Sequence, residues 1–217
     1  MGAQKGGQQC PDYSDYTVKW ASLPWEVEQA YQLRRRVFCE EQGMFEHDDR
    51  DAIDESAQLL VVLGNYGGWH QEVVGTVRIH QQRDGHWTGS RLAVDQAFRT
   101  QGQLGAGLIR LAVSSARALG CRRFTARVQE RNELLFRRLH WHTRDYCHVS
   151  GVRHAIMEAD LHAYPPCHSP YSGMVLKALR QHRHTDYWPG LFEPQQQVHV
   201  CATAKPLPEM TVLREAV

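Results

Sequence analysis

The chain has 217 residues, with 25 lysines and arginines against 24 aspartates and glutamates and a formal net charge of +1. This length suits one domain with an appendage, and the charge balance argues against a nucleic-acid-binding protein, which usually carries a strong basic excess. No apolar run approaches the roughly 20 residues that a membrane span needs, so we expect no membrane association.

The first elements predicted from the residue pattern are a strand and a helix. A flexible lead-in over residues 1–15 precedes a strand at 16–21, where the side chains alternate in character. Pro24 then favours a helix start, and apolar residues at helical spacing predict a helix over residues 25–40. An acidic segment follows at 40–57.

β-branched residues dominate the next part of the chain. They predict strands at 58–64 and 72–80, joined by a turn, and a third strand at 87–95. A long helix is predicted at 104–119, where Gly120 ends it. The later elements are a strand at 123–129, a short helix at 132–139 and a hairpin of strands at 145–150 and 154–161.

The composition changes in the last quarter of the chain, residues 165–217, which contains seven of the nine prolines. Proline removes a backbone donor and interrupts periodicity, so we expect this extension to add no strand to the sheet and to be partly disordered. Within it, only residues 173–182 have a helical pattern.

Cysteine and histidine spacing excludes the usual metal and redox motifs. The six cysteines form no C-x-x-C pair, and histidine pairs such as His140 and His142 are two residues apart, whereas one helix face needs three or four. We therefore predict no metal site. The first residues lack the apolar core of a signal peptide, so we expect reduced thiols and a cytoplasmic location.

A glycine-rich loop between the third of these strands and the long helix organises the rest of the chain. Leu92, Ala93 and Val94 end the strand, and Gly102 and Gly105 lead into the helix. Free amides at a helix N-terminus can hold a phosphate, and glycine allows a close approach. The loop lacks the Gly-Lys-Ser/Thr of a nucleotide phosphate loop, and its glycine spacing and missing acid exclude a dinucleotide fingerprint.

This loop resembles motif A of the GNAT N-acetyltransferase superfamily, although it is one residue longer than usual. The resemblance implies that Arg99, Gly102, Gly105 and Ala106 hold the pyrophosphate of acetyl-CoA, a co-substrate that the three strand residues before them also contact. It implies too that backbone amides near Val94 polarise the thioester carbonyl.

The order of elements matches the GNAT fold over residues 16–164. This is an α+β fold in which a mixed, mostly antiparallel sheet is flanked by helices in three α/β/α layers. Six blocks, from RRRVFCEEQG to NELLFRRLHW, resemble the nitrogen-starvation N-acetyltransferase subfamily found in nitrilase gene clusters. The resemblance implies transfer of an acetyl group to the amine of a small molecule in nitrogen metabolism.

The short helix at 132–139 offers two further coenzyme contacts by resemblance. Asn132 matches the asparagine that often begins this helix in GNAT enzymes, and Phe136 stands in place of the tyrosine that protonates the departing thiolate. Phe136 has no proton to give. Water or another side chain would then act as the acid, or the thiolate would leave unassisted.

The general base has two candidates. Glu41 is the first, with Asp51 and Asp54 behind it, because family members commonly line the acceptor side with this segment. A solvated acidic loop is the alternative, and as a rim these acids would attract a cationic amine. His80, which titrates near neutrality, is the second candidate, with packing as its alternative role.

Two other functions stay open at this point. A non-catalytic acyl-CoA-binding sensor or partner protein is suggested by Phe136 and by the proline-rich extension. A homoserine-lactone-synthase-like enzyme would share the arginine-rich helix and acidic loop, and it would require S-adenosylmethionine. Exposed strand edges favour a homodimer.

Overall fold

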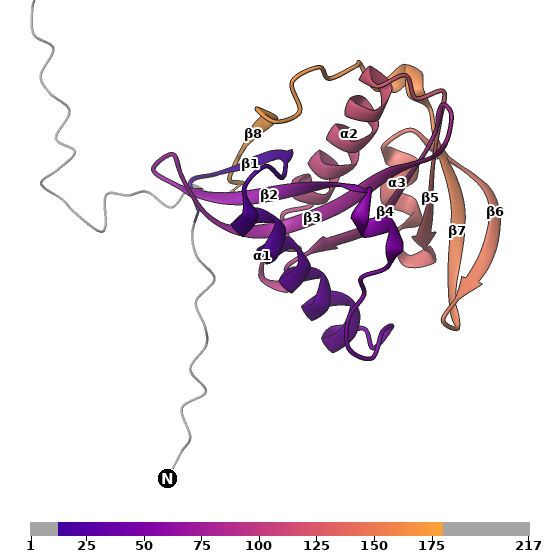
Figure 1. The fold of residues 1–217 in the computed structure, drawn as a ribbon, viewed down its shortest axis with the longest axis horizontal. Coiled ribbons are helices and arrows are strands. Elements are labelled where there is room, and N and C mark those ends of the chain that lie inside the picture. The colour runs from indigo at the N-terminus through magenta and orange to yellow at the C-terminus, as the bar shows by residue number, and fades with distance from the viewer. Residues whose placement is uncertain (1–12, 180–217) are drawn as a thin grey trace, which may run out of the picture. The chain divides into compact units, whose positions relative to one another are not determined.

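The structure, a computed structural model, describes residues 13–179. Within this range eight strands form one sheet: β1 (Asp15–Trp20), β2 (Gln58–Tyr66), β3 (Trp69–Arg83), β4 (His86–Val94), β5 (Arg123–Gln129), β6 (Trp141–Val149), β7 (Val152–Ala159) and β8 (Met174–Lys177). Their order across the sheet is β6-β7-β5-β4-β3-β2-β1-β8 (Figure 1). Strands β4 and β5 are parallel, and the other neighbours with a described register are antiparallel.

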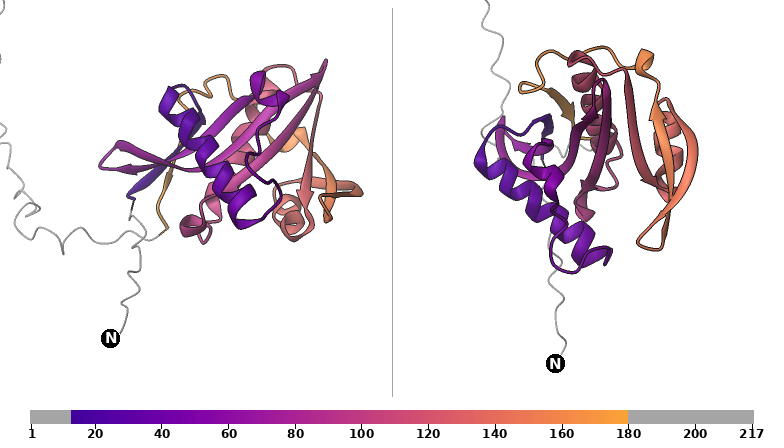
Figure 2. Two further views of the ribbon diagram at one scale, coloured as in Figure 1. Left: turned by 60° about the horizontal axis from the view of Figure 1, so that its bottom comes forward. Right: turned by 45° about the vertical axis from the view of Figure 1, so that its right-hand side comes forward.

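Helices cover both faces of this sheet. Helix α1 (Pro24–Arg35) continues into a π-helical turn (Arg36–Glu41) and packs on one face, against β2, β3 and β4. Helices α2 (Gln103–Ala118) and α3 (Glu133–Arg138) contribute to the core on the other face (Figures 1 and 2). The predicted α+β architecture, three α/β/α layers around a mixed and mostly antiparallel sheet, is therefore confirmed.

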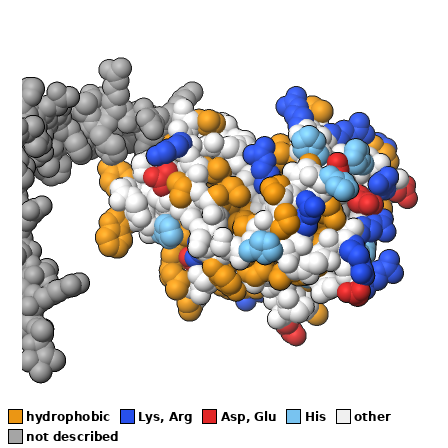
Figure 3. Space-filling model, turned by 90° about the horizontal axis from the view of Figure 1, so that it is seen from above, with side chains coloured by type: hydrophobic (Ala, Val, Ile, Leu, Met, Phe, Trp, Pro, Cys, Tyr) orange, Lys and Arg blue, Asp and Glu red, His pale blue; other side chains and the backbone are white. Residues whose placement is uncertain are grey.

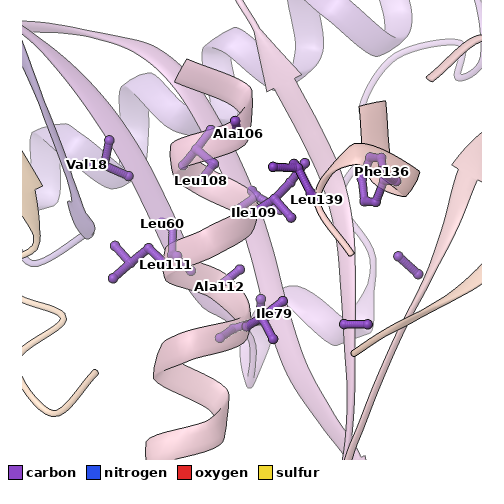
Figure 4. Packing of buried hydrophobic residues seen from close by; sticks show 14 of the residues in the cluster. Val18, Leu60, Ile79, Ala106, Leu108, Ile109, Leu111, Ala112, Phe136 and Leu139 are labelled. Carbon is purple, nitrogen blue, oxygen red and sulfur yellow. The ribbon is translucent and has the colours of Figure 1, made fainter. Parts of the chain in front are cut away.

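The apolar run of β2 explains why the sheet is buried on both sides. Leu60 faces α2, where it joins Leu108 and Leu111 in one core cluster (Figure 4). Leu59 and Val61 point the opposite way, into a second cluster under α1. Successive side chains of a strand alternate between faces, so a strand that is apolar at every position needs a helix on each side.

Local signals in the sequence set several element boundaries. Pro24 is the first residue of α1, and Gly120, just after α2, has a φ of +83° that suits glycine. The β2–β3 hairpin is tighter than predicted, because Gly67 and Gly68 both adopt positive φ and close it in two residues. Upstream, Tyr13 is already buried and stacks on Phe98, so ordered structure begins before residue 16.

Strand β8 corrects two predictions about the C-terminal quarter. Over residues 174–177 the predicted helix is wrong, and so is the expectation that the extension adds no strand, because β8 pairs antiparallel with β1. Met174 and Leu176 pack against the core, whereas Val175 and Lys177 are exposed. This alternation has the period of two that is typical of a strand. Pro170 still contributes, since its carbonyl accepts the amide of Trp20 at 2.9 Å. Residues 180–182 of the predicted helix lie outside the described range.

The strand β6 forms the edge of the sheet opposite β8. Most of its side chains are exposed, among them His142, Arg144, Asp145 and His148. Basic and histidine side chains gather at this end of the molecule (Figure 3). Charged side chains along an edge disfavour uncontrolled strand pairing. In the described range, no helix is long and apolar enough to cross a bilayer.

Candidate active site

The two parallel strands at the centre of the sheet separate after a short stretch of pairing. β4 and β5 pair from His86 with Arg123 to Gly89 with Ala126, and no pairing continues beyond. A bulge in β4 begins this separation, because Arg91 and Leu92 together oppose one residue of β3. Arg91 adopts a φ of +55° in the bulge. Backbone groups on this edge of β4 past Gly89 therefore face a gap instead of a partner strand (Figure 2).

A cavity of about 560 Å³ occupies the gap. On the α2 side it is lined by apolar residues, including Ile109 and Ala112 of α2 and Phe136 of α3. On the α1 side it is lined by polar and charged residues of β3 and β5 and by apolar residues that follow α1. The cavity is thus lined by residues from both faces of the sheet. Two molecules, one bound on each face, could therefore contact each other between β4 and β5.

The first turn of α2 forms an open cradle of amide groups beside this gap. Within residues 13–179, the amides of Gly102, Gln103 and Gly105 have no hydrogen-bond acceptor. A Cβ added at Gly102 would meet nothing within 4 Å, and one at Gly105 would meet only Val94, at 3.9 Å. Neither glycine has a positive φ, so the backbone does not require them. The absence of their side chains keeps the space above the amides open, as an anion site requires.

Arg99 lies across this loop and is held at two points. Its Nε donates to the carbonyl of Val94 at 2.9 Å, and its Nη2 lies 2.5 Å from Glu41. Glu41 comes from the end of the π-helical turn, and it is not among the residues that line the cavity. Arg99, the predicted phosphate ligand, and Glu41, the first candidate base, therefore form an ion pair with each other beside the loop.

The other predicted coenzyme contacts divide into two groups. Leu92, Asn132 and Phe136 line the cavity, where Phe136 packs edge-on against Trp141 with ring centroids 5.0 Å apart. The other predicted contacts lie at the end of β4 and the start of α2, and they do not line the cavity: Ala93, Val94 and Ala106. Of these, Ala93 is buried under α1, and Ala106, a residue of α2, is buried in the core on the other face of the sheet.

His80, in β3, lies on the α1 side of the cavity, and its partner on the neighbouring strand β4 is Thr88. Its Nδ1 is buried and has no hydrogen-bond partner in the described part of the chain. Burial, together with the charge of Arg78, lowers the pKa of His80 below its ordinary value of 6.5. The imidazole is therefore neutral at pH 7 and can accept a proton.

An ionic network of three arginines and three aspartates supports this side of the cavity: Arg34, Arg78 and Arg91 with Asp49, Asp51 and Asp54. Arg34, which is fully buried, lies 2.8 Å from Asp49 and 2.6 Å from Asp54. Arg78 lies 2.6 Å from Asp51 and 2.7 Å from Asp54. Arg91 lies 2.8 Å from Asp49. The six charges sum to zero.

The network removes Asp51 and Asp54 as candidate bases. Arg78 hydrogen-bonds both oxygens of Asp51 and lowers the pKa of that carboxyl. Burial would raise the pKa of Asp54, but hydrogen bonds from Arg34 and the Asp51 amide hold it far below its usual range. Both carboxylates are charged and paired at neutral pH, so these aspartates do not form the acidic rim that we expected.

The predictions from sequence did not pair the acidic segment with Arg34, Arg78 or Arg91. One signal was available in α1, where Arg34 falls between Leu33 and Val37 on the apolar stripe. A charged residue on a buried stripe requires a buried partner, and the aspartates 15 and 20 positions later provide it. Among the residues with a described placement, no group of three or more His, Cys, Asp or Glu side chains is positioned to hold a metal ion.

Comparison with known proteins agrees with this geometry. A sequence profile of the acetyltransferase (GNAT) family matches residues 20–141. No curated protein matches the chain significantly.

Solved structures share the fold at low sequence identity. A Lactobacillus plantarum protein described as an N-acetyltransferase is 20% identical, with a TM-score of 0.60 over 67% of this chain and 98% of its own. An acyl-CoA N-acyltransferase from Pseudomonas aeruginosa is 19% identical, with a TM-score of 0.54 over 67% and 99%. The CoA-dependent acyl-homoserine lactone synthase BjaI is 16% identical, with a TM-score of 0.57 over 67% and 83%. These likenesses support the fold.

Proposed function

The chain belongs to the acetyltransferase (GNAT) family, and on that premise we propose that it transfers an acetyl group from acetyl-CoA to the amine of a small molecule. The observation that carries the proposal is the cavity between β4 and β5, which is lined from both faces of the sheet. A coenzyme on the α2 side and an amine on the α1 side would meet in this gap.

The coenzyme side of the proposal depends on the loop at the start of α2. The free amides of Gly102, Gln103 and Gly105 and the positive end of the α2 dipole suit a pyrophosphate. The apolar lining from α2 and α3 suits the thioester arm, because it offers few polar groups that would need hydrogen-bond partners. Leu92, on the β4 bulge, also lines the cavity.

The reaction needs a polarised carbonyl and a proton acceptor. We propose that amides on the unpaired edge of β4, near Val94, stabilise the oxyanion that forms as the amine nitrogen attacks the thioester carbon. The C–N bond forms and the C–S bond breaks, and the proton lost by the amine passes to the neutral imidazole of His80. The thiolate leaves without a protein acid and takes its proton from water, since Phe136 offers none.

Three further proposals rest on observations outside the site. The six ordered blocks support a place in the nitrogen-starvation subfamily and a role in nitrogen metabolism. We propose a cytoplasmic location on the cysteine usage. Within residues 13–179 the outer edges of β6 and β8 have no partner strand, which supports a homodimer.

Calorimetric titration of acetyl-CoA into wild type, Gly105→Ala and Gly105→Glu tests the coenzyme site. The space at Gly105 accepts a Cβ, so both variants should fold, and thermal melting checks this. We expect wild type to bind, Gly105→Ala to bind about tenfold more weakly, and Gly105→Glu to bind undetectably, because its carboxylate would repel the pyrophosphate. A folded wild type that binds no acetyl-CoA would contradict the proposed function.

Product analysis separates the alternatives. A homoserine-lactone-synthase-like enzyme would consume S-adenosylmethionine and release a lactone, whereas the likeness to BjaI reflects the fold alone. A non-catalytic sensor would bind acetyl-CoA without releasing CoA in the presence of any amine. We expect CoA release that depends on an amine and needs no S-adenosylmethionine.

A further inference from the structure

From the charges that line the α1 side of the cavity, we infer that the acceptor amine also carries a carboxylate, which Arg127 and Arg131 bind. This inference rests on the proposed function and narrows its substrate class to amino carboxylates. It replaces our sequence-based expectation that an acidic rim attracts the acceptor.

The cavity has an excess of free positive charge. Asp51 is the one carboxylate that lines it within residues 13–179, and this side chain is paired with Arg78 and Arg91. Because the network containing these three residues is neutral, it leaves no net charge for a ligand. Arg127 and Arg131 also line the cavity, and neither has a salt bridge or hydrogen bond among the described residues. Two unpaired guanidinium groups therefore remain.

The alternation of β5 places Arg127 on the acceptor side. Phe124, Ala126 and Val128 are buried under α2, so Arg127, between the last two, points to the opposite face. Helix α1 packs mainly against β2, β3 and β4. Arg131 follows in the turn that joins β5 to α3. The guanidinium group of Arg127 is thus available to a ligand that enters from the side of α1, and Arg131 lines the same cavity.

The wall opposite these arginines is apolar. Four apolar residues from the π-helical turn after α1 and the segment that follows it line the cavity: Phe38, Met44, Phe45 and Ile53. A hydrogen bond of 2.9 Å between the side chains of Gln129 and Gln42 ties this segment to β5 across the gap. The acceptor that fits both walls has an apolar body beside its amine and its carboxylate.

The chain offers matched controls for these arginines. Arg83 and Arg138 are also exposed and have no salt bridge or hydrogen bond in the described range, but they do not line the cavity. Arg83→Gln and Arg138→Gln remove the same charge as Arg127→Gln and Arg131→Gln without touching the site. These control variants distinguish the loss of a specific contact with the substrate from the effect of a change in the net charge of the protein.

The test compares amines that differ only in the carboxylate, with CoA release as the readout. Phenylalanine, phenylalaninamide and 2-phenylethylamine form one series, and leucine, leucinamide and isopentylamine form a second. We expect wild type to favour the carboxylates in kcat/KM by about tenfold, because two guanidinium groups can donate several charge-assisted hydrogen bonds to one carboxylate. Arg127→Gln and Arg131→Gln should each raise KM for the carboxylates about tenfold and leave the amides unchanged, and the control variants should match wild type.

Each other outcome has a definite meaning. Equal or better turnover of the amides and decarboxylated amines would overturn the inference and leave the proposed acetyl transfer standing. If Arg127→Gln and Arg131→Gln weaken acetyl-CoA binding in calorimetry and leave the acceptor preference unchanged, the arginines bind the coenzyme and the inference is also overturned. If neither series is acetylated by wild type, the inference is overturned, and the calorimetric titration of acetyl-CoA decides separately whether the proposed function stands.

Discussion

Arg99 and Glu41 form an ion pair with 2.5 Å between Nη2 and Oε2, and this pair joins the phosphate loop to the end of the π-helical turn after α1. Both side chains are partly exposed, so the pair itself adds little stability. Its position has a larger consequence. A carboxylate that holds the loop arginine stands next to the amides proposed for the pyrophosphate, and it competes with that anion for Arg99.

Glu41→Gln therefore tests whether Glu41 is a base or a competitor. We expect acetyl-CoA to bind up to about fivefold more tightly, since removal of an exposed charge of the same sign changes binding by roughly 1 kcal/mol or less. We expect turnover to stay within about threefold of wild type. Glu40→Gln, which alters the exposed pair with Arg35, is the control. If turnover instead falls by about 100-fold or more while acetyl-CoA affinity is unchanged, Glu41 is the base.

His80→Gln should lower kcat by about 100-fold, the scale of a lost general base. The pH profile gives the sharper measurement. The pKa of His80 is lowered below 6.5, and the neutral ring is the active form, so wild-type kcat/KM should fall as the pH falls through that lowered pKa. This acid limb should be absent in His80→Gln and retained in His148→Gln, which alters an exposed histidine of β6. An unchanged limb in His80→Gln would assign the base elsewhere.

Asp54→Asn should lower the free energy of unfolding by about 3–5 kcal/mol at pH 7, because it leaves Arg34 and Arg78 buried with less compensating charge. Denaturant unfolding measures this, with Asp84→Asn as the control. Asp84 pairs with Arg122 at the surface, where both side chains are mostly exposed, so its loss should cost less than about 1 kcal/mol.

The stabilities of wild type and Asp54→Asn should also differ in their dependence on pH. The folded-state pKa of Asp54 is lowered, so its contribution to stability is present above its ordinary pKa of 3.8 and is lost as the pH falls below that value. Wild type should therefore lose stability more steeply than Asp54→Asn below about pH 4. Parallel curves for the two proteins would show that Asp54 is not the titrating group.

Gly173→Ala tests whether β8 is part of the folded sheet. Gly173 has a φ of +62°, and an added Cβ would lie 1.9 Å from the carbonyl oxygen of Val18. We expect a loss of about 3 kcal/mol or more, with faster proteolysis near β8. Gly151→Ala is the matched control, because Gly151 has a φ of +75° with nothing within 4 Å, and its loss should cost about 1 kcal/mol. Equal costs for the two variants would contradict a docked β8.

Local patterns in the sequence predicted the element order through β7 correctly. The 3.6-residue period of α2, the apolar run of β2 and the glycine after α2 each depend on neighbours within a few residues, so the sequence alone reveals them. The sequence analysis missed β8 because this strand depends on a partner that is distant in the sequence. Four residues after a proline-rich connection have little propensity of their own, and the open edge of β1 makes them a strand.

The sequence by itself determined the fold family and the glycine loop proposed to bind the pyrophosphate, because both depend on residues adjacent in the chain: a strand, glycines without side chains and the first turn of a helix. The tertiary structure decided the charge of the site. Arg34, Arg78 and Arg91 neutralise the aspartates, and Arg127 and Arg131 stay unpaired in the cavity. Electrostatic pairing depends on distances of a few ångströms between side chains from different elements, and residue spacing does not specify those distances.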